Sequence, residues 1–422
     1  MISGPFGLDA SQQVAALGPI DTLAVLAHLG ALIDKSLIRA LPDADGEVRY
    51  RMLETMRQFA LERLAESGEQ QAARARHLVC FLALAEDAKA QLEGPNQGAW
   101  LKRLDCDRDN LLSAHTWCNH ADNGAERGLR PVNALLRFWL SRGLLVQGHH
   151  AYLEALARPP REGVRTAEYA RLRCVGLINA GRMCAYRGVD NDAATMLEES
   201  ILIARRGCFN ELLSAALAHL GFVRLSLHDR IGARICLKGV LALARKLEDK
   251  PALLNHAVTN LAELKRVEGN FSAASTLYEE GLHYVRAAGD RLRTMIALNN
   301  LAMVAVANDD SQRARAMLIE SLAISDELGS RRGRLVAMEV CVGLASHQAS
   351  WTLAASFDSA ADIHTVQMGR RRDIADAAFL APFIERSRAA IGATGYAVAE
   401  TSGRALSYDD AVAAMRRWLK ES

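Results

Sequence analysis

Small side chains recur at a nearly constant interval along the central part of the chain. One series falls at steps of 40 or 41 residues, at Gly181, Gly221, Ala262, Ala302 and Gly343. A second series follows twelve residues after the first, at Ala193, Ala233, Ala274, Ala314 and Ala355. Two antiparallel helices pack closely only where neither carries a bulky side chain at the crossing. The pattern therefore predicts successive pairs of helices, each pair about 40 residues long.

Turn-forming residues separate the predicted helices. Within each pair they fall between the two small residues, at Arg187-Gly188, His228-Asp229, Gly269-Asn270 and Asn308-Asp309. A second set of breaks ends each pair, at Gly207, Asp249, Gly289 and Gly329. Glycine at such a break favours the left-handed cap of a helix. Large residues lie four positions, or one helical turn, after four alanines of the second series: Leu197, Leu237, Tyr278 and Leu318. We expect these side chains to pack against the next pair of helices.

This arrangement resembles the tetratricopeptide repeat, in which small residues occupy the eighth and twentieth positions and a large one the twenty-fourth. The usual repeat has ~34 residues, so the longer unit implies longer helices, like those in the sensor domains of bacterial signal-transduction ATPases. We place the repeats at residues 166–366, with a degenerate unit before them around Phe138 to Ala157. Stacked units of this kind form a superhelix whose concave groove binds ligands. A rigid spacer is the alternative.

The first 70 residues follow a different pattern. A helical stripe of leucines runs from Asp21 to Asp34, and Asp21 is placed to cap its start. Two short β-capable runs, residues 36–41 and 47–52, predict a hairpin, and a helix follows from Leu53 to Ser67. This is the order of a winged helix. The predicted fold class is therefore all-α, an α-solenoid of tetratricopeptide-like helical hairpins preceded by a small winged-helix domain with a short β-hairpin.

Several segments resemble one known family. Leu32 to Ile38 reads LIDKSLI and Arg49 to Ala60 reads RYRMLETMRQFA. Both look like the winged-helix end of STAND-type ATPase modules in bacterial transcriptional regulators of the LuxR-like and AfsR-like kinds. Residues 94–111 resemble the helical linker of that family, which we place at 71–165. Residues 403–412 resemble its closing segment, so we assign 367–422 to C-terminal capping helices.

The resemblance implies the sensor half of such a regulator. In the family a nucleotide-binding domain precedes the winged helix, and the repeats hold it inactive until a signal binds. This chain has no GxxxxGK(S/T) loop to cradle a triphosphate, so we expect no ATPase activity from it. Its sequence starts where the resemblance places the end of that domain, and an upstream ATPase domain is therefore an expected partner.

One position bears on that partner. In distant relatives of the apoptosis and plant-immunity type, a histidine at the head of the last winged-helix helix contacts the nucleotide phosphate. The matching position here is Leu53, and a leucine cannot donate that hydrogen bond. Glu54 and Arg57 remain beside it as polar neighbours. We assign these three residues to the surface that faces a nucleotide-binding domain.

The charges of the whole chain nearly cancel, with 51 lysines and arginines against 49 aspartates and glutamates. No overall field therefore attracts nucleic acid or anionic lipid. The expected wing tip carries only acidic charges, at Asp43, Asp45 and Glu47, whereas phosphate contacts need cations. Direct DNA binding is thus the alternative function and not the leading one. Its candidate contacts are a small basic patch: Lys35, Arg39 and Arg51.

The remaining composition narrows the class of protein. Eight cysteines are scattered without a paired spacing, which suits a reducing cytosol. No stretch approaches ~18 uncharged apolar residues, so we expect a cytoplasmic chain that contacts no membrane. Metal-capable side chains cluster once along the chain, but their spacing matches no zinc finger: Cys106, His115, Cys118 and His120. We expect no metal, no cofactor and no catalytic residues.

Polar residues recur at one position of the predicted groove. In four of the predicted pairs, the residue two positions before the small residue of the first helix is polar: Asn179, His219, Asn260 and Asn300. In tetratricopeptide domains that position faces the groove, where an amide binds a peptide backbone; alternatively, the asparagines bond adjacent helices as an internal ladder. The same register points Arg182, Glu263 and Arg266 inward. We therefore predict a non-catalytic module for signal sensing and protein interaction in a bacterial transcriptional regulator, with an effector or a protein partner in this groove.

Overall fold

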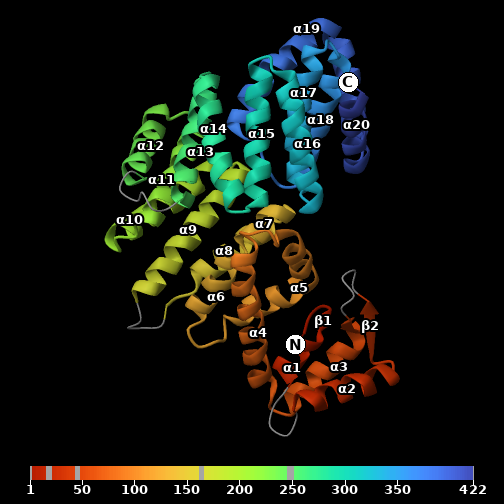
Figure 1. The fold of residues 1–422 in the computed structure, drawn as a ribbon. Coiled ribbons are helices and arrows are strands. Elements are labelled where there is room, and N and C mark those ends of the chain that lie inside the picture. The colour runs from red at the N-terminus through yellow and green to blue at the C-terminus, as the bar shows by residue number, and fades with distance from the viewer. Residues whose placement is uncertain (1, 16–20, 43–47, 161–165, 245–250, 422) are drawn as a thin grey trace. The chain divides into compact units, whose positions relative to one another are not determined.

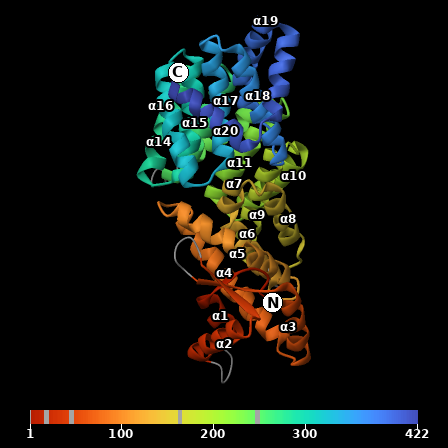
Figure 2. The ribbon, with the colours of Figure 1, turned by 90° about the vertical axis from the view of Figure 1, so that its right-hand side faces the viewer.

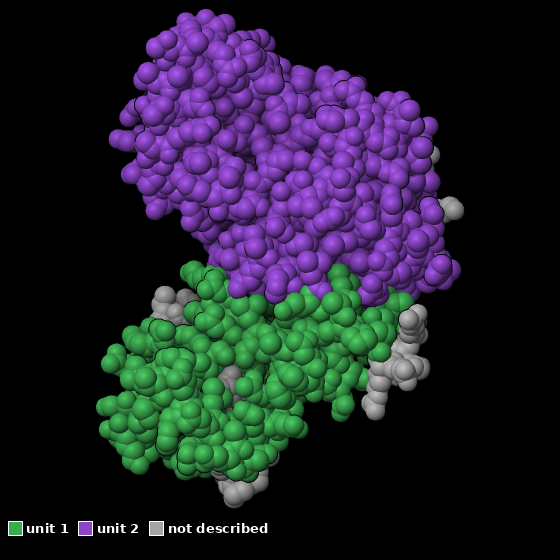
Figure 3. All heavy atoms as spheres, turned by 180° about the vertical axis from the view of Figure 1, so that it is seen from behind, with its two compact units in different colours: residues 1–92, 99–135, 154–172 green, residues 93–98, 136–153, 173–422 purple. Residues whose placement is uncertain are grey.

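A computed structural model describes residues 2–15, 21–42, 48–160, 166–244 and 251–421. The chain divides into two compact units, which Figure 3 colours separately. The first consists of residues 1–92, 99–135 and 154–172, and the second of residues 93–98, 136–153 and 173–422. The four-domain division made from the sequence stays a prediction.

The N-terminal part of the first unit folds around a small antiparallel sheet (Figure 1). In chain order its elements are β1 (Phe6–Gly7), α1 (Leu8–Ala15), α2 (Thr22–Asp34), β2 (Ile38–Pro42), β3 (Val48–Met52) and α3 (Glu54–Glu66). The described strands lie in the order β1-β3-β2. Their core consists of Phe6, Val25, Leu29, Ile38 and Tyr50.

The sequence predicted most of this domain. Asp21 caps α2, because its carboxylate accepts a hydrogen bond from the backbone N–H of Ala24 at 2.7 Å. The predicted hairpin is confirmed, since β2 and β3 pair with Ile38 opposite Met52. Neither β1 nor α1 was predicted from the sequence. Strand β1 has two residues, which is too short to show the alternation that identifies strands. The acidic wing tip, residues 43–47, lies outside the described residues.

Three longer helices complete most of the first unit: α4 (Gln70–Gln91), α5 (Gln97–Trp117) and α6 (Gly124–Ala134). The guanidinium of Arg49 in β3 donates two hydrogen bonds to the carboxylate of Asp107 in α5, at 2.8 and 2.9 Å. Both side chains are buried, and bidentate pairs of this kind are strong and directional. They fix the sheet on α5. Helix α3, by contrast, buries none of its side chains.

In the part of the second unit that the structure describes, five pairs of helices follow one another (Figures 1 and 2). The pairs are α9 (Ala167–Arg187) with α10 (Asp190–Arg206), α11 (Asn210–Ser226) with α12 (Arg230–Ala244), α13 (Pro251–Val267) with α14 (Phe271–Ala287), α15 (Arg291–Ala307) with α16 (Ser311–Glu327), and α17 (Arg331–His347) with α18 (Trp351–Gln367). Shorter helices precede them where the sequence suggested a degenerate unit: α7 (Leu136–Arg142) and α8 (Leu145–Ala157). The predicted all-α fold class with repeated helical hairpins is confirmed.

The two series of small residues lie where paired helices cross, and every member of both series is buried. A Cβ atom added to Gly181 would lie 3.1 Å from the carbonyl oxygen of Ala193. One added to Gly221 would lie 3.5 Å from the carbonyl oxygen of Ala233. The first small residue of a pair therefore packs on the backbone of the second, which explains the twelve-residue spacing. The large residues are buried as well: Leu197, Leu237, Tyr278 and Leu318.

The predicted turns within the pairs are confirmed. One residue in each takes the left-handed backbone conformation, with φ of 81° at Gly188, 62° at His228, 76° at Gly269 and 60° at Asp309. The helices can therefore reverse direction within a few residues.

The breaks between pairs follow the prediction only in part. Gly289 and Gly329 are left-handed, with φ of 66° and 62°. The break at Gly207 is confirmed, because α10 ends at Arg206 and α11 begins at Asn210, but the left-handed residue there is Cys208, with φ of 52°, and Gly207 has φ of −87°. Helix α10 continues to Arg206, so Gly207 is the cap and the next residue must make the turn. The break predicted at Asp249 lies outside the described residues.

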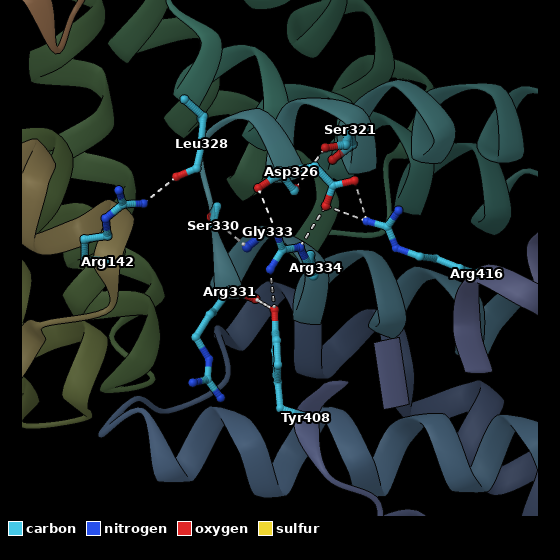
Figure 4. Close-up of polar contacts among 11 residues, drawn as sticks. Arg142, Ser321, Asp326, Leu328, Ser330, Arg331, Gly333, Arg334, Tyr408 and Arg416 are labelled. Atoms are coloured by element: carbon cyan, nitrogen blue, oxygen red, sulfur yellow. Dashed lines mark hydrogen bonds and ion pairs between the residues drawn. The ribbon is translucent and has the colours of Figure 1, made fainter. Parts of the chain in front are cut away.

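Helices α19 (Ile374–Ala405) and α20 (Tyr408–Glu421) end the second unit. Helix α19 packs on α18 and bends at Gly392, where φ is 69°. Figure 4 shows how α20 is held: the guanidinium of Arg416 donates to both carboxylate oxygens of Asp326 in α16, at 2.6 and 2.7 Å. The hydroxyl of Tyr408 accepts a hydrogen bond from Arg334 in α17 at 3.3 Å. None of the described helices has the length and apolar character that crossing a bilayer requires.

Candidate binding site in the repeat groove

A cavity of about 170 Å³ lies where the first helices of the pairs come together, and we call it the groove cavity. Side chains from α9, α11, α13, α15 and α17 line it, as do Asp373 and Asp376 at the start of α19. Most of the predicted groove residues are among the lining: Arg182, His219, Asn260, Glu263, Arg266 and Asn300. The register that the small residues define therefore brings these side chains to one place.

Asn179 is the predicted groove residue that does not line the cavity. It is 7% exposed, and its amide nitrogen donates to the hydroxyl of Tyr152 in α8 at 3.0 Å. Asn300 also bonds a neighbouring helix, since its amide donates to a carboxylate oxygen of Glu263 at 2.8 Å, yet it faces the cavity as well. The same register position thus serves helix-to-helix bonding at some repeats and cavity lining at others.

One side of the groove cavity is internally neutralised. The guanidinium of Arg266 is 4% exposed and donates to Glu263 at 2.8 Å and to Asp376 at 2.7 Å. Asp373 caps α19 by accepting a hydrogen bond from the backbone N–H of Ala375 at 2.9 Å. Burial, followed by the nearby carboxylates of Asp376 and Glu263, raises the pKa of Asp373 to about 8. Its carboxyl group is therefore mostly protonated at neutral pH.

The other side of the groove cavity is basic. Arg182, Arg332 and Arg370 surround the ring of Tyr186, with their guanidinium carbons 5.4, 5.3 and 4.3 Å from its centroid. Arg182 also donates a hydrogen bond to the Tyr186 hydroxyl at 3.0 Å. Burial alone would raise the pKa of Tyr186, but the three positive charges outweigh it and lower the pKa to about 8. Such arrangements favour a negative charge.

His219 lines the cavity between these two sides. Burial lowers its pKa to about 3, with smaller contributions from the charges of Arg182 and Arg293. The imidazole is therefore neutral at physiological pH and offers one donor and one acceptor. The cavity can bond a ligand through this ring without adding to its positive charge.

Residues 370–373, which we call the crossing segment, connect α18 to α19 and contact the first repeat. The backbone N–H of Arg371 donates to the carbonyl oxygen of Tyr186 in α9 at 2.9 Å. Its guanidinium donates to both carboxylate oxygens of Asp190 in α10, at 2.7 and 3.1 Å. Arg372 pairs with Glu339 at 2.7 Å and with Asp358 at 3.0 Å. The crossing segment therefore links the first and last helical pairs.

Sequence reasoning missed several residues of the site. Tyr186, Arg332 and Arg370 were not among the predicted groove residues, and the crossing segment follows the last repeat. The run Arg370-Arg371-Arg372 is a visible signal, but a charge run is most often a solvated surface. Only the folded chain shows that this run reaches the first helical pair.

The residues predicted on the winged helix gather at a separate cavity of about 530 Å³. Arg39 and Arg51 lie directly opposite each other on β2 and β3, and both line it together with Leu53 and Glu54. Arg57 lines it too and donates to Glu54 at 2.9 Å. Lys35 lies apart, exposed at the C-terminal cap of α2. The two sets of residues predicted there, for DNA and for a nucleotide-binding partner, therefore largely share one surface.

Comparison with known proteins bears on the first unit. Residues 4–65 match a family model described as a winged helix-turn-helix domain. This region is a winged helix-turn-helix domain. Proteins of Mycobacterium bovis and Mycobacterium tuberculosis, whose names describe them as HTH-type transcriptional regulators, are 37% identical to this chain over 145 residues. That match covers 34% of this chain and 16% of each relative, so the chain aligns with a small part of their length.

Solved structures show a weaker likeness. BtubC from P. vanneervenii aligns with 54% of this chain and 92% of its own, at 17% identity and a TM-score of 0.40. A signal transduction ATPase with numerous domains and a tetratricopeptide repeat sensor, from Pyrococcus horikoshii, aligns with 98% of this chain and 63% of its own. Its identity is 15% and its TM-score is 0.41.

Proposed function

We propose that this chain is a non-catalytic sensing module of a bacterial transcriptional regulator, and that it binds an effector or a protein partner in the groove cavity. The main support is the convergence of amide, imidazole, carboxylate and guanidinium groups from successive helical pairs on one cavity. A concave site with a few converging polar groups is the usual form of a ligand site. The similarity to HTH-type regulators supports the regulatory role.

The size of the cavity limits what fits inside it. Its volume is about 170 Å³, whereas pockets for drug-sized ligands span roughly 300–1,000 Å³. A whole peptide helix is therefore too large. A small effector, or a single side chain of a partner protein, fits the site better.

Direct DNA binding through the winged helix is the second candidate, since residues 4–65 match a winged helix-turn-helix domain. In such proteins the second helix of the motif enters the major groove, and α2 has that place here. Helix α2 contains no lysine or arginine, and Leu23 on its surface is 75% exposed. Phosphate contacts from cations supply most non-specific affinity for DNA. The groove therefore has the stronger support.

Thermal unfolding of the purified chain, in the presence of single metabolites and short peptides, tests the proposal. A ligand at 100 times its dissociation constant stabilises a protein by about 2.7 kcal/mol. We expect at least one compound to raise the unfolding temperature of the wild type. The double variant His219→Ala/Asn260→Ala, which removes two lining side chains, should lose that response.

A matched control replaces a histidine and a side-chain amide on the outer helices, where both side chains are exposed: His283→Ala/Gln312→Ala. This control should respond like the wild type. If no compound shifts the wild type, or if the groove variant responds as strongly as the control, the proposal is wrong.

A further inference from the structure

The arginines around the groove cavity fall into two classes. One class has carboxylate partners within 4 Å, and its members are Arg266, Arg293, Arg371 and Arg372. The other class consists of Arg182, Arg332 and Arg370. Throughout the described residues, no ion pair joins any of these three to a carboxylate, and each lies instead on the ring of Tyr186. The three form what we call the arginine cluster.

Three carboxyl groups, those of Glu339, Asp373 and Asp376, line the same smaller cavity as Arg332 and Arg370, but among the described residues none of them forms an ion pair with the cluster. The pKa of Tyr186 is lowered only to about 8, so its hydroxyl is mostly uncharged at pH 7. The charge of Asp373 acts on Arg370, but the pKa of Asp373 is itself raised to about 8 by burial and by Asp376. The arginine cluster is therefore a local excess of positive charge.

Burial makes this excess costly. Arg370 is 8% exposed, and burial, followed by the charge of Arg332, lowers its pKa to about 9. A buried charge without a partner destabilises a protein, and a counter-charge offsets that cost. An anion from solution, held between the guanidinium groups, would supply that partner.

The space beside the cluster is large enough for such an anion. Tyr186 and Arg332 line both the groove cavity and a smaller adjoining cavity of about 30 Å³, where Arg370 also lies. Arg182 lines the groove cavity. At about 30 Å³ per water molecule, the groove cavity has the volume of roughly six waters, which suits one oxyanion group with a short organic body.

We propose that the arginine cluster binds the oxyanion group, a phosphate or a carboxylate, of a small anionic effector whose remainder lies in the groove cavity. This inference rests on the proposed function and names the chemical class of the effector. Guanidinium forks match phosphate and carboxylate with two parallel hydrogen bonds. His219 and Asn260, which line the same cavity, would contact the uncharged part of the molecule.

The position of the cluster also indicates what binding would do. Arg182 lies on α9, Arg332 on α17 and Arg370 on the crossing segment. A shared anion would therefore add a link between the first and last helical pairs, beside the existing contacts of Arg371. Binding would therefore strengthen the contact between the first and last helical pairs, and the crossing segment would be held more firmly when the effector is bound.

Isothermal titration with inorganic phosphate, compared with chloride at equal ionic strength, tests the proposal on the full chain. We expect phosphate to bind the wild type and to bind Arg332→Gln at least tenfold more weakly. Arg332→Lys, which keeps the charge but loses the fork, should fall between them. The matched control Arg206→Gln removes the same charge from an exposed site on α10 and should bind like the wild type. Repeating the titration with citrate shows whether carboxylates are preferred to phosphate.

Unfolding in phosphate-free buffer separates ligand binding from a structural role. Because Arg332→Gln removes repulsion within the cluster, it should leave the unfolding temperature unchanged or raise it. A lower unfolding temperature would show that the cluster stabilises the fold by itself, and equal phosphate binding in all variants would show no site; either result overturns the inference. If neutral compounds bind through His219 and Asn260 while no oxyanion depends on Arg332, the inference fails and the proposed function stands.

Discussion

The groove cavity and the winged helix differ in how their polar side chains are held. In the groove cavity, charged and amide groups from distant parts of the chain are partly or fully buried and bonded to one another, as Arg266 is to Asp376. On the winged helix, the candidate residues are mostly exposed and lie near one another in the sequence, as Arg57 and Glu54 do in α3. A buried polar group must have a partner or a ligand, whereas an exposed one is satisfied by water.

This difference shows which of the two regions holds more of the buried polar groups that a ligand needs. The winged helix has the fold of a DNA-binding domain, but α2 lacks cations and α3 buries none of its side chains. The repeats have a fold with no fixed function, but their inner helices carry a polar cavity. Function is therefore better argued from the site than from the fold.

The largest expected difference between the regions concerns their ion pairs. Replacing Arg266 by methionine leaves Glu263 and Asp376 buried without their partner and should lower the free energy of unfolding by about 3–5 kcal/mol. Replacing Arg57 by methionine breaks an exposed ion pair on α3 and should change the free energy of unfolding very little. Urea unfolding followed by circular dichroism measures both. Equal losses for the two variants would remove the distinction between the regions.

Glycine substitutions should act in opposite directions in the two regions. Gly181→Leu forces a side chain against Ala193 and Leu197 and should destabilise the chain by about 1–3 kcal/mol. Gly30 lies inside α2, where an added Cβ would meet nothing within 4 Å, so Gly30→Ala should stabilise it by about 0.5–1 kcal/mol. Thermal unfolding of the two variants checks the signs. A stable Gly181→Leu would mean that the paired helices do not pack closely there.

A pH titration sharpens the description of the basic side of the cavity. Tyr186 should ionise near pH 8, two units below an ordinary tyrosine, because Arg182, Arg332 and Arg370 favour its phenolate. The stability from this effect is present above the unfolded pKa of about 10 and is lost as the pH falls through about 8. Ultraviolet absorbance of the phenolate follows the ionisation, and Tyr186→Phe should abolish the step near pH 8. The step should move to higher pH in phosphate if an anion neutralises the arginines.

The smallest expected effect is on DNA. The triple variant Lys35→Ala/Arg39→Ala/Arg51→Ala should leave the weak affinity for duplex DNA nearly unchanged, since α2 offers no cation to the major groove. Gel-shift titrations at two salt concentrations measure this, because phosphate contacts give a steep salt dependence. Tight, salt-dependent binding that the triple variant abolishes would instead favour the winged helix as the functional surface.

The sequence was most informative where a pattern reflects a direct contact. Gly181 and Ala193 are twelve residues apart because one packs on the backbone of the other, so the helical pairs followed from spacing alone. The repeat register, read with the tetratricopeptide resemblance, predicted His219 and Asn260 in the groove, and both line the cavity. The same register also predicted Asn179 in the groove, but its amide nitrogen donates a hydrogen bond to the hydroxyl of Tyr152 and the residue does not line the cavity.

The missed features depend on contacts between parts that share no period. Arg370 reaches Tyr186 across more than 180 residues of sequence, through a segment outside the repeats. The strand β1 is two residues long and exists only because β3 offers it an edge. At Gly207 the position of the left-handed turn depended on where α10 ended, and helix ends are uncertain from sequence by a residue or two.

Hydrogen exchange on the intact chain tests most directly whether the repeats hold the effector site. Exchange is compared with and without the compound that raises the unfolding temperature most. We expect slower exchange in α9, α11, α13, α15 and α17 and in the crossing segment, with no change in α1, α2 and α3. Protection confined to residues 21–66, with the repeats unchanged, would contradict a binding site in the groove.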